Sequence, residues 1–227
     1  MKTFNAEKKK LIVDEIIRHR LADQIVQGTY GKEDNGVWKG CAVGCAIHSL
    51  NVKLGKDYKT SEHSVYETEF GIPLLLANLQ DRIFEGLSVA ESKVWPENFM
   101  SAVPEEADLS LVWPKFAVWL LVDEKDGVLR FATTTKQTAA IEGVAEFYRK
   151  VIIGEKVFKD DWADASAAAS AAYAVAASAS VAYAAAAAAS DAYAAAASAA
   201  YAASAAVAAY GHYTKMAAKL IEILKAA

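Results

Sequence analysis

The chain has 227 residues and a formal net charge of −4, so it lacks the basic excess that binds nucleic acid. Charged residues interrupt its first apolar positions, which excludes a signal peptide, and no run of about 20 strongly apolar residues predicts a membrane span. The 2 cysteines are too few for a disulfide framework. We therefore expect a cytoplasmic protein with reduced thiols, no nucleic-acid partner and no membrane contact.

The first half of the chain predicts helices separated by polar loops. Apolar residues recur at helical spacing over residues 5–27, and Gly28 ends this pattern. A Gly- and Asn-rich loop leads to a short helix of small side chains, residues 41–50. A second loop precedes one or two helical turns in residues 64–70. Pro73 suits the first turn of the next helix, which Gly86 closes.

The second half continues the helical pattern. Prolines and tryptophans punctuate residues 95–114, and residues 114–122 are apolar on nearly every side, which predicts a buried central helix. Asp126 and Gly127 indicate a turn, residues 128–135 a short strand and residues 138–153 a last helix. The sequence thus predicts an all-α, or nearly all-α, compact domain in residues 1–158.

Residues 159–227 form a tail of a different kind. About two thirds of residues 163–210 are alanine, without glycine or proline, and alanine has the strongest helix propensity. We expect either a helical rod or a close-packed helical hairpin or bundle, with tyrosines at the contacts and self-association into a homo-oligomer. The chain then ends in an amphipathic helix, whose apolar stripe contains Met216, Leu220, Ile223 and Leu224.

Four motifs support a family resemblance. They are HR-x-x-D-x-x-x-QGTY from His19, KGCAVGC-x-x-H from Lys39, YETE-x-GIP from Tyr66 and DRIFEGL from Asp81. With the Ala- and Ser-rich tail, the set resembles a family of uncharacterised proteins common in bacterial and phage genomes. The resemblance covers most of the chain and implies a shared fold without an assigned activity. Its occurrence in phage genomes suggests a host-interaction factor by analogy.

The pair Cys41 and Cys45 with His48 is the strongest candidate for chemistry, because the three residues share one helix face. One interpretation is packing, since small cysteines beside glycines let another helix approach closely. A second is a zinc site in which His63 completes a ligand set of Cys41, Cys45 and His48.

A third interpretation is a cysteine nucleophile. Cys41 lies at a predicted helix N-terminus, where the helix dipole favours a thiolate. His63 would then act as the base, with Glu67 or Glu69 orienting it.

Three further polar residues, Tyr66, Glu69 and Arg82, are candidates for binding a ligand. Asp81, Arg82 and Glu85 form a charged cluster that we interpret as a solvent-exposed helical network.

These features favour a binding or interaction protein that recognises a small molecule or a protein. The alternative is a cysteine- or zinc-dependent enzyme that uses Cys41 and His63. A third class, an ice-binding helical rod, rests on alanine content alone.

Overall fold

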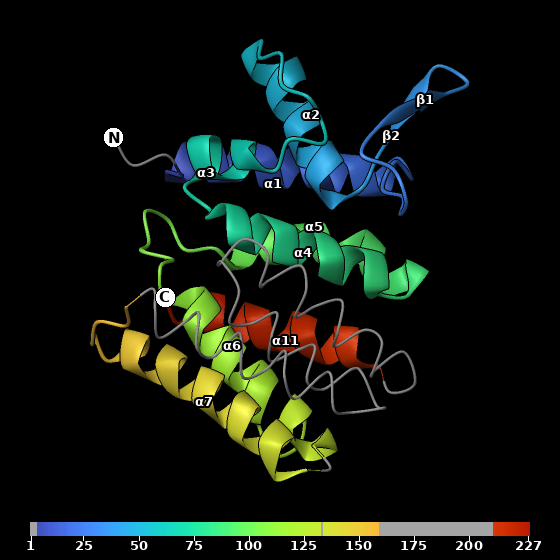
Figure 1. The fold of residues 1–227 in the computed structure, drawn as a ribbon. Coiled ribbons are helices and arrows are strands. Elements are labelled where there is room, and N and C mark those ends of the chain that lie inside the picture. Colours follow the sequence, from blue (N-terminus) through green and yellow to red (C-terminus); the bar gives the residue numbers. More distant parts are fainter. Residues whose placement is uncertain (1–3, 133, 159–210) are drawn as a thin grey trace. The chain divides into compact units, whose positions relative to one another are not determined.

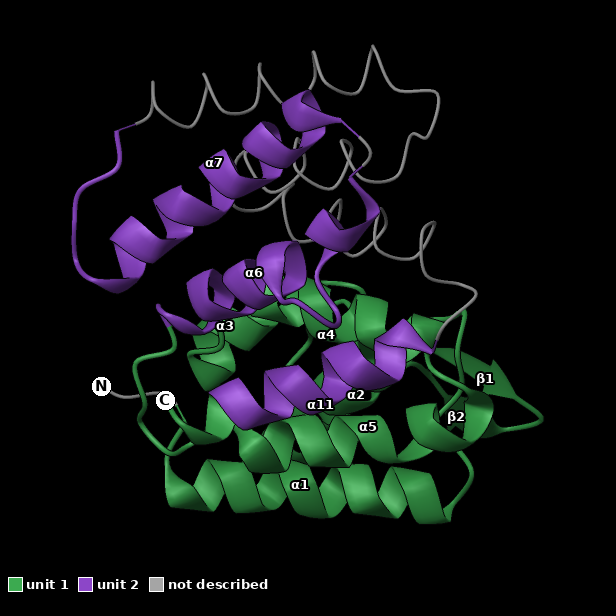
Figure 2. Ribbon diagram, turned by 90° about the horizontal axis from the view of Figure 1, so that it is seen from below, with its two compact units in different colours: residues 1–109, 224–227 green, residues 110–223 purple. Residues whose placement is uncertain are grey.

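The computed structural model describes residues 4–132, 134–158 and 211–227 (Figure 1). These residues are mostly helical, as the sequence predicted, and also contain two short strands. The chain divides into two compact units, residues 1–109 with 224–227 and residues 110–223 (Figure 2). This division falls inside the stretch 1–158 that we expected to be one domain. The predicted rod or bundle of residues 163–210 and its contacts lie outside the described residues. No described helix is both long and apolar enough to span a membrane.

The first unit begins with α1, Ala6–Leu21, which Asn5 caps by accepting a hydrogen bond from the Lys8 amide at 2.9 Å. The helix is shorter than the predicted 5–27. Asp23 adopts a positive φ of 54°, and Ile25 forms a parallel bridge with Gly40. The apolar periodicity continues past the helix because Ile25 is buried in this bridge.

A β-hairpin follows where the sequence predicted only a loop. Strands β1, Lys32–Asp34, and β2, Val37–Lys39, pair antiparallel. Asn35 and Gly36 join them with φ values of 51° and 76°, the left-handed conformations that a two-residue hairpin turn requires. The hairpin extends away from the helices of its unit, with residues 31–37 exposed (Figure 1).

Four helices complete the first unit: α2, Ala42–Leu54; α3, Ser64–Phe70; α4, Leu74–Gly86; and α5, Val89–Ala102. Helix α2 is buried over its first three turns and packs against α1, α4 and α5. Helix α5 starts with a capping box between Ser88 and Glu91. This packing brings the start of α2 close to one face of α4.

The second unit contains α6, Val112–Val122; a 3₁₀ helix, Val128–Phe131; α7, Thr135–Ile152; and all but the last two residues of α11, His212–Lys225. The predicted strand at 128–135 is wrong, because Val128–Phe131 form the 3₁₀ turn and α7 begins at Thr135. Helix α6 is buried as predicted and packs against α7, where the Trp113 indole donates to the Tyr148 hydroxyl at 3.0 Å. The predicted apolar stripe of α11 is confirmed, since all four of its residues are buried.

Candidate functional site

The two cysteines occupy the start of α2. Cys41 is the N-cap residue, and its Sγ accepts a hydrogen bond from the Gly44 amide at 3.4 Å. The Cys45 thiol donates to the Gly40 carbonyl at 3.4 Å. Both thiols are free and buried, as the small neighbouring residues predicted.

The two candidate histidines face different partners. The His48 ring stacks on Trp38, with centroids 4.1 Å apart and an interplanar angle of 7°. His63 is the N-cap residue of α3, and its Nε2 lies 3.1 Å from Asp81 Oδ2. Among the described residues, no three of the expected zinc ligands Cys41, Cys45, His48 and His63 bring their ligand atoms together.

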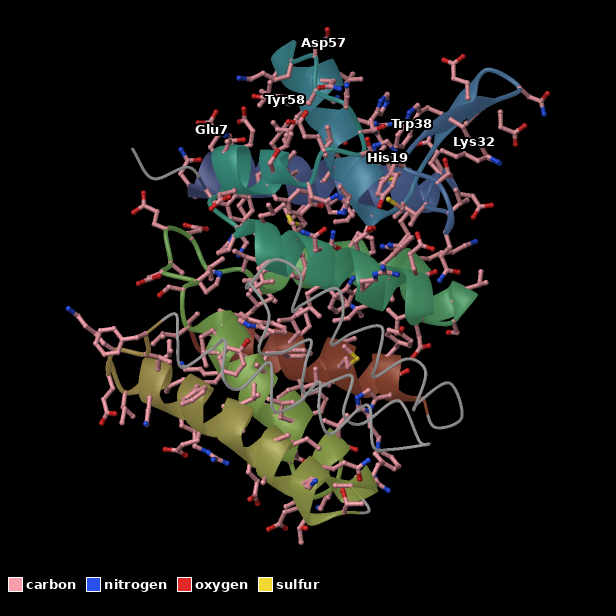
Figure 3. All side chains as sticks on the ribbon, in the orientation of Figure 1. Glu7, His19, Lys32, Trp38, Asp57 and Tyr58 are labelled. Atoms are coloured by element: carbon pink, nitrogen blue, oxygen red, sulfur yellow. The ribbon has the colours of Figure 1, made fainter. Side chains whose placement is uncertain are left out.

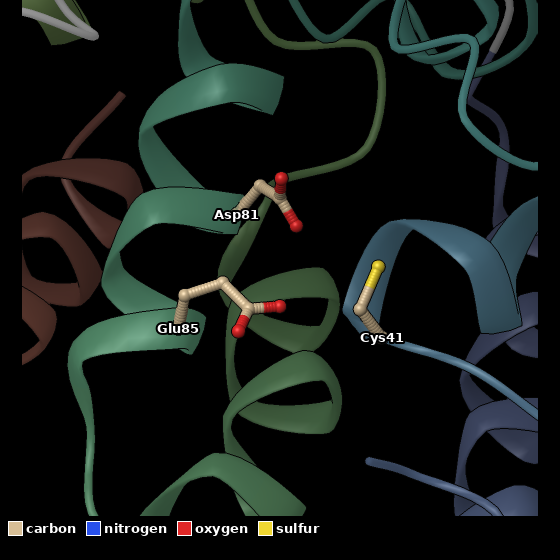
Figure 4. Close-up of side chains that lie close together, drawn as sticks. All are labelled: Cys41, Asp81 and Glu85. Carbon is tan, nitrogen blue, oxygen red and sulfur yellow. The ribbon is translucent and has the colours of Figure 1, made fainter. Parts of the chain in front are cut away.

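A different set of ligands converges at this place. One ligand atom each from Cys41, Asp81 and Glu85 lies within 4.8 Å of the other two. Asp81 and Glu85 are four residues apart on α4, so their carboxylates share the helix face that looks toward the start of α2 (Figure 4). We call these three side chains the acidic thiol cluster.

Asp81 lies at the centre of the cluster and is only 8% exposed. Its Oδ2 accepts a hydrogen bond from the Tyr30 hydroxyl at 3.2 Å and also contacts His63. Its Oδ1 is buried without a hydrogen-bond partner. Buried polar atoms are almost always satisfied, so this oxygen marks a place for a positively charged or donating group.

Glu85 lies at the solvent side of the cluster and accepts hydrogen bonds from the Gly28 amide, at 3.1 Å to Oε1 and 3.0 Å to Oε2. Burial and the negative charge of Asp81 raise the pKa of Glu85, and together they outweigh the hydrogen bond from Gly28 and the positive charge of Arg82. Asp81 therefore disfavours the charged form of Glu85.

The Cys41 thiol is 1% exposed, and burial together with the charge of Asp81 raises its pKa well above the ordinary range. Its thiol is protonated at neutral pH, whereas a nucleophile needs the thiolate. The two ring nitrogens of His63 contact the Ser61 carbonyl and Asp81. Burial and the charge of Asp81 therefore disfavour the thiolate that Cys41 would need as the expected nucleophile.

The one ionic contact of the two carboxylates within the described residues joins Asp81 to His63, which carries a charge only when it is protonated. Among the described residues, no lysine or arginine forms an ion pair with Asp81 or Glu85. By contrast, the buried Glu15 and Glu69 each pair with two cations. Two acidic groups and a thiol therefore face one another around a position that a cation would satisfy.

The remaining predicted residues have other surroundings. Glu67 and Arg82 are exposed, and Tyr66 is 1% exposed with its hydroxyl 3.5 Å from the Ala42 carbonyl. Glu69 accepts hydrogen bonds from Lys8 Nζ at 2.8 Å and the Tyr58 hydroxyl at 2.5 Å. These contacts tie α1 and the loop after α2 to α3.

Sequence reasoning missed Tyr30, Asp81 and Glu85 as site residues. Our interpretation of a solvent-exposed charged network is wrong for Asp81, which is buried. The four-residue spacing of Asp81 and Glu85 was the available indication, because it places both carboxylates on one face of α4.

No protein-family model, no curated protein and no solved structure matches the chain. The resemblance to bacterial and phage proteins stays a prediction. The acidic thiol cluster is therefore the feature on which a functional proposal can be based.

Proposed function

We propose that this protein binds a divalent transition-metal ion, with zinc the best match, at the acidic thiol cluster. The observation that carries the proposal is the buried, unpartnered Oδ1 of Asp81. The Asp81 carboxylate lies close to Cys41 and Glu85 and forms no ion pair with a lysine or arginine in the described part of the chain. A bound metal ion would satisfy this oxygen and balance the negative charge.

The donor set fits a zinc ion. Zinc binds thiolate sulfur at about 2.3 Å and carboxylate oxygen at about 2.0–2.2 Å, in a tetrahedral arrangement. Ligand atoms around such an ion lie about 3.5 Å apart. The three atoms here already lie within 4.8 Å of one another, so small side-chain rotations bring them to this spacing, and a water molecule would be the fourth ligand.

The proton balance also supports a metal ion. A coordinating thiol loses its proton to solvent, because the metal replaces the proton as the positive partner of sulfur. The same ion removes the repulsion between Asp81 and Glu85. A bound metal ion would thus offset the negative charges of the thiolate and the two carboxylates.

The supporting contacts resemble those of natural metal centres. Tyr30 and His63 both contact Asp81 Oδ2, which leaves Oδ1 for the metal. Such outer contacts fix the orientation of a ligating carboxylate. His63, which we expected to be a ligand, has a supporting role in this proposal, and Cys41 is the one expected ligand that is retained.

Zinc titration calorimetry tests the proposal. We expect the wild type to bind one zinc ion, and Asp81→Asn to weaken binding at least tenfold, because it removes a ligand charge without changing side-chain size. Asp57→Asn, at an exposed position, is the matched control. Magnesium, which prefers oxygen ligands alone, should not compete. Equal zinc affinities for Asp81→Asn and the wild type would contradict the proposal.

A further inference from the structure

Residues 24–31, which join α1 to β1, form a segment that we call the strap. Its backbone is fixed to the start of α2 on both sides of Gly40. Gly40 donates to the Gln24 carbonyl at 3.0 Å, and Val26 donates to the Gly40 carbonyl at 2.9 Å. The Cys41 amide donates to the Thr29 carbonyl at 2.7 Å. The strap therefore runs directly past the proposed metal ligand Cys41.

The strap also lies in close contact with the first turn of α2. A Cβ atom placed on Gly44 would be 1.8 Å from the Tyr30 carbonyl oxygen. Only a glycine lets the two backbones approach this closely. This contact positions the Tyr30 side chain, whose hydroxyl then reaches Asp81.

On its other side the strap is anchored to α4. The Gln27 side-chain amide donates to the carbonyls of Phe84 at 2.8 Å and Leu87 at 3.0 Å. The Gly28 amide donates to Glu85 and the Tyr30 hydroxyl to Asp81. Two of the strap's anchors thus end on the carboxylates that we assign to the metal.

The hairpin continues from the strap, and its Trp38 ring lies against Gly31, the last strap residue, where a Cβ would be 2.8 Å from the ring. A Cβ on Gly40 would be 2.5 Å from the Trp38 ring, and the same ring stacks on His48 of α2. The Trp38 ring also lies near the His19 ring of α1, with centroids 5.5 Å apart (Figure 3). Lys32 pairs with Lys39 at the end of the hairpin that joins the strap. The strap and the base of the exposed hairpin therefore pack against the same end of α2.

We propose that metal binding locks the strap and, through it, the base of the hairpin. This inference rests on the proposed metal site. A metal ion holds Asp81 and Glu85 in fixed orientations, and these carboxylates are the hydrogen-bond acceptors for Tyr30 and Gly28. Without the ion, only hydrogen bonds hold the two carboxylates in these orientations, so both anchors are weaker. The metal centre then acts as a switch for the order of a surface-exposed element.

Hydrogen exchange with and without zinc tests this inference in the full chain. We expect zinc to slow amide exchange in residues 24–31 and at Cys41 at least fivefold, a typical coupling between two linked events. Amides of α7, in the other unit, serve as the internal control. Cobalt substitution reports metal binding independently through the sulfur-to-metal charge-transfer band.

The variant Tyr30→Phe separates metal binding from locking. It keeps all three ligands and removes only the hydroxyl that reaches Asp81. We expect Tyr30→Phe to bind cobalt with the same charge-transfer band but to lose part of the strap protection. If metal binding and strap order are coupled, the coupling is reciprocal. The factor by which Tyr30→Phe reduces the zinc-dependent protection of the strap should therefore also be the factor by which it reduces metal affinity.

The outcomes distinguish the two proposals. Metal binding by the wild type without slower exchange in the strap would overturn the locking inference and leave the metal site standing. Absence of metal binding would overturn both. If Tyr30→Phe does not fold, the wild-type comparison with and without zinc decides the question alone.

Discussion

At Cys41 the chemistry is set by neighbours that are distant in the sequence. The thiol lies at a helix N-terminus, where the dipole favours a thiolate, as the sequence suggested. Burial and the Asp81 carboxylate act in the opposite direction and raise its pKa. The sequence identified the residue but not its charge state, because Asp81 lies 40 positions further along the chain.

Glu69, which the sequence suggested as a ligand-binding residue, instead forms ion pairs with Lys8 and Lys56. Burial alone would raise its pKa, but hydrogen bonds from Lys8 and Tyr58 and the nearby Lys56 outweigh burial and lower the pKa to about 2. Its carboxylate is thus occupied by side chains of the same unit. The residue types were visible in the sequence, but their pairing partners were not.

The lowered pKa of Glu69 predicts a pH dependence of stability. A carboxylate with a depressed folded pKa stabilises the protein above its ordinary value of 4.5, and this contribution is lost as the pH falls toward about 2. Urea unfolding should show Glu69→Gln on the order of 2 kcal/mol less stable than the wild type at neutral pH. The difference should shrink below about pH 4.

The exposed Glu67→Gln on the same helix is the control for that experiment, with a small and constant effect. A Glu69→Gln difference that does not change between about pH 5 and about pH 2.5 would show that the ion pairs contribute nothing.

At the scale of elements, the sequence predicted long periodic helices well and irregular connections poorly. Buried apolar stripes identified α1, α6, α7 and α11. The end of α1 was placed too late because Ile25 continues the helical spacing while lying in an extended bridge. The hairpin was missed although Asn35 and Gly36 form a typical hairpin turn, because strands of three residues have too short a pattern to detect.

The contact between the strap and α2 gives an element-scale prediction. Gly44→Ala forces the strap away from α2, because the new Cβ would lie 1.8 Å from the Tyr30 carbonyl oxygen. We expect a loss of about 1–3 kcal/mol in the free energy of unfolding. Urea denaturation followed by circular dichroism measures this loss.

Gly143→Ala is the matched control. Gly143 lies inside α7, and a Cβ there would meet no atom within 4 Å. The substitution should stabilise the protein by about 0.5–1 kcal/mol, as alanine does in a helix interior. A Gly44→Ala variant as stable as Gly143→Ala would contradict the close approach of the strap.

For the whole molecule, the important feature is that every residue of the proposed centre belongs to one compact unit. Cys41, Asp81 and Glu85, with Tyr30 and His63, all lie within residues 1–109. They come from α2, α4, the strap and the start of α3. Sequence patterns predicted these helices but not which of their faces meet, because that depends on long-range packing.

The Ala-rich segment contributes differently to the whole. Its composition predicts helix and self-association, and these expectations concern residues outside the described ones. The proposed metal centre does not depend on them, because all its ligands lie in the first unit. The proposed metal binding and the expected association through the tail can therefore be tested separately.

The absorption spectrum of the cobalt-substituted full chain tests the central claim most directly. A thiolate bound to cobalt gives a sulfur-to-metal charge-transfer band, and the account predicts this band in the wild type with one equivalent of metal. Cys45→Ser, whose thiol faces the Gly40 carbonyl, should keep the band. Cys41→Ser should lose it. A band that survives Cys41→Ser, or no band in the wild type, would contradict a metal centre at Cys41.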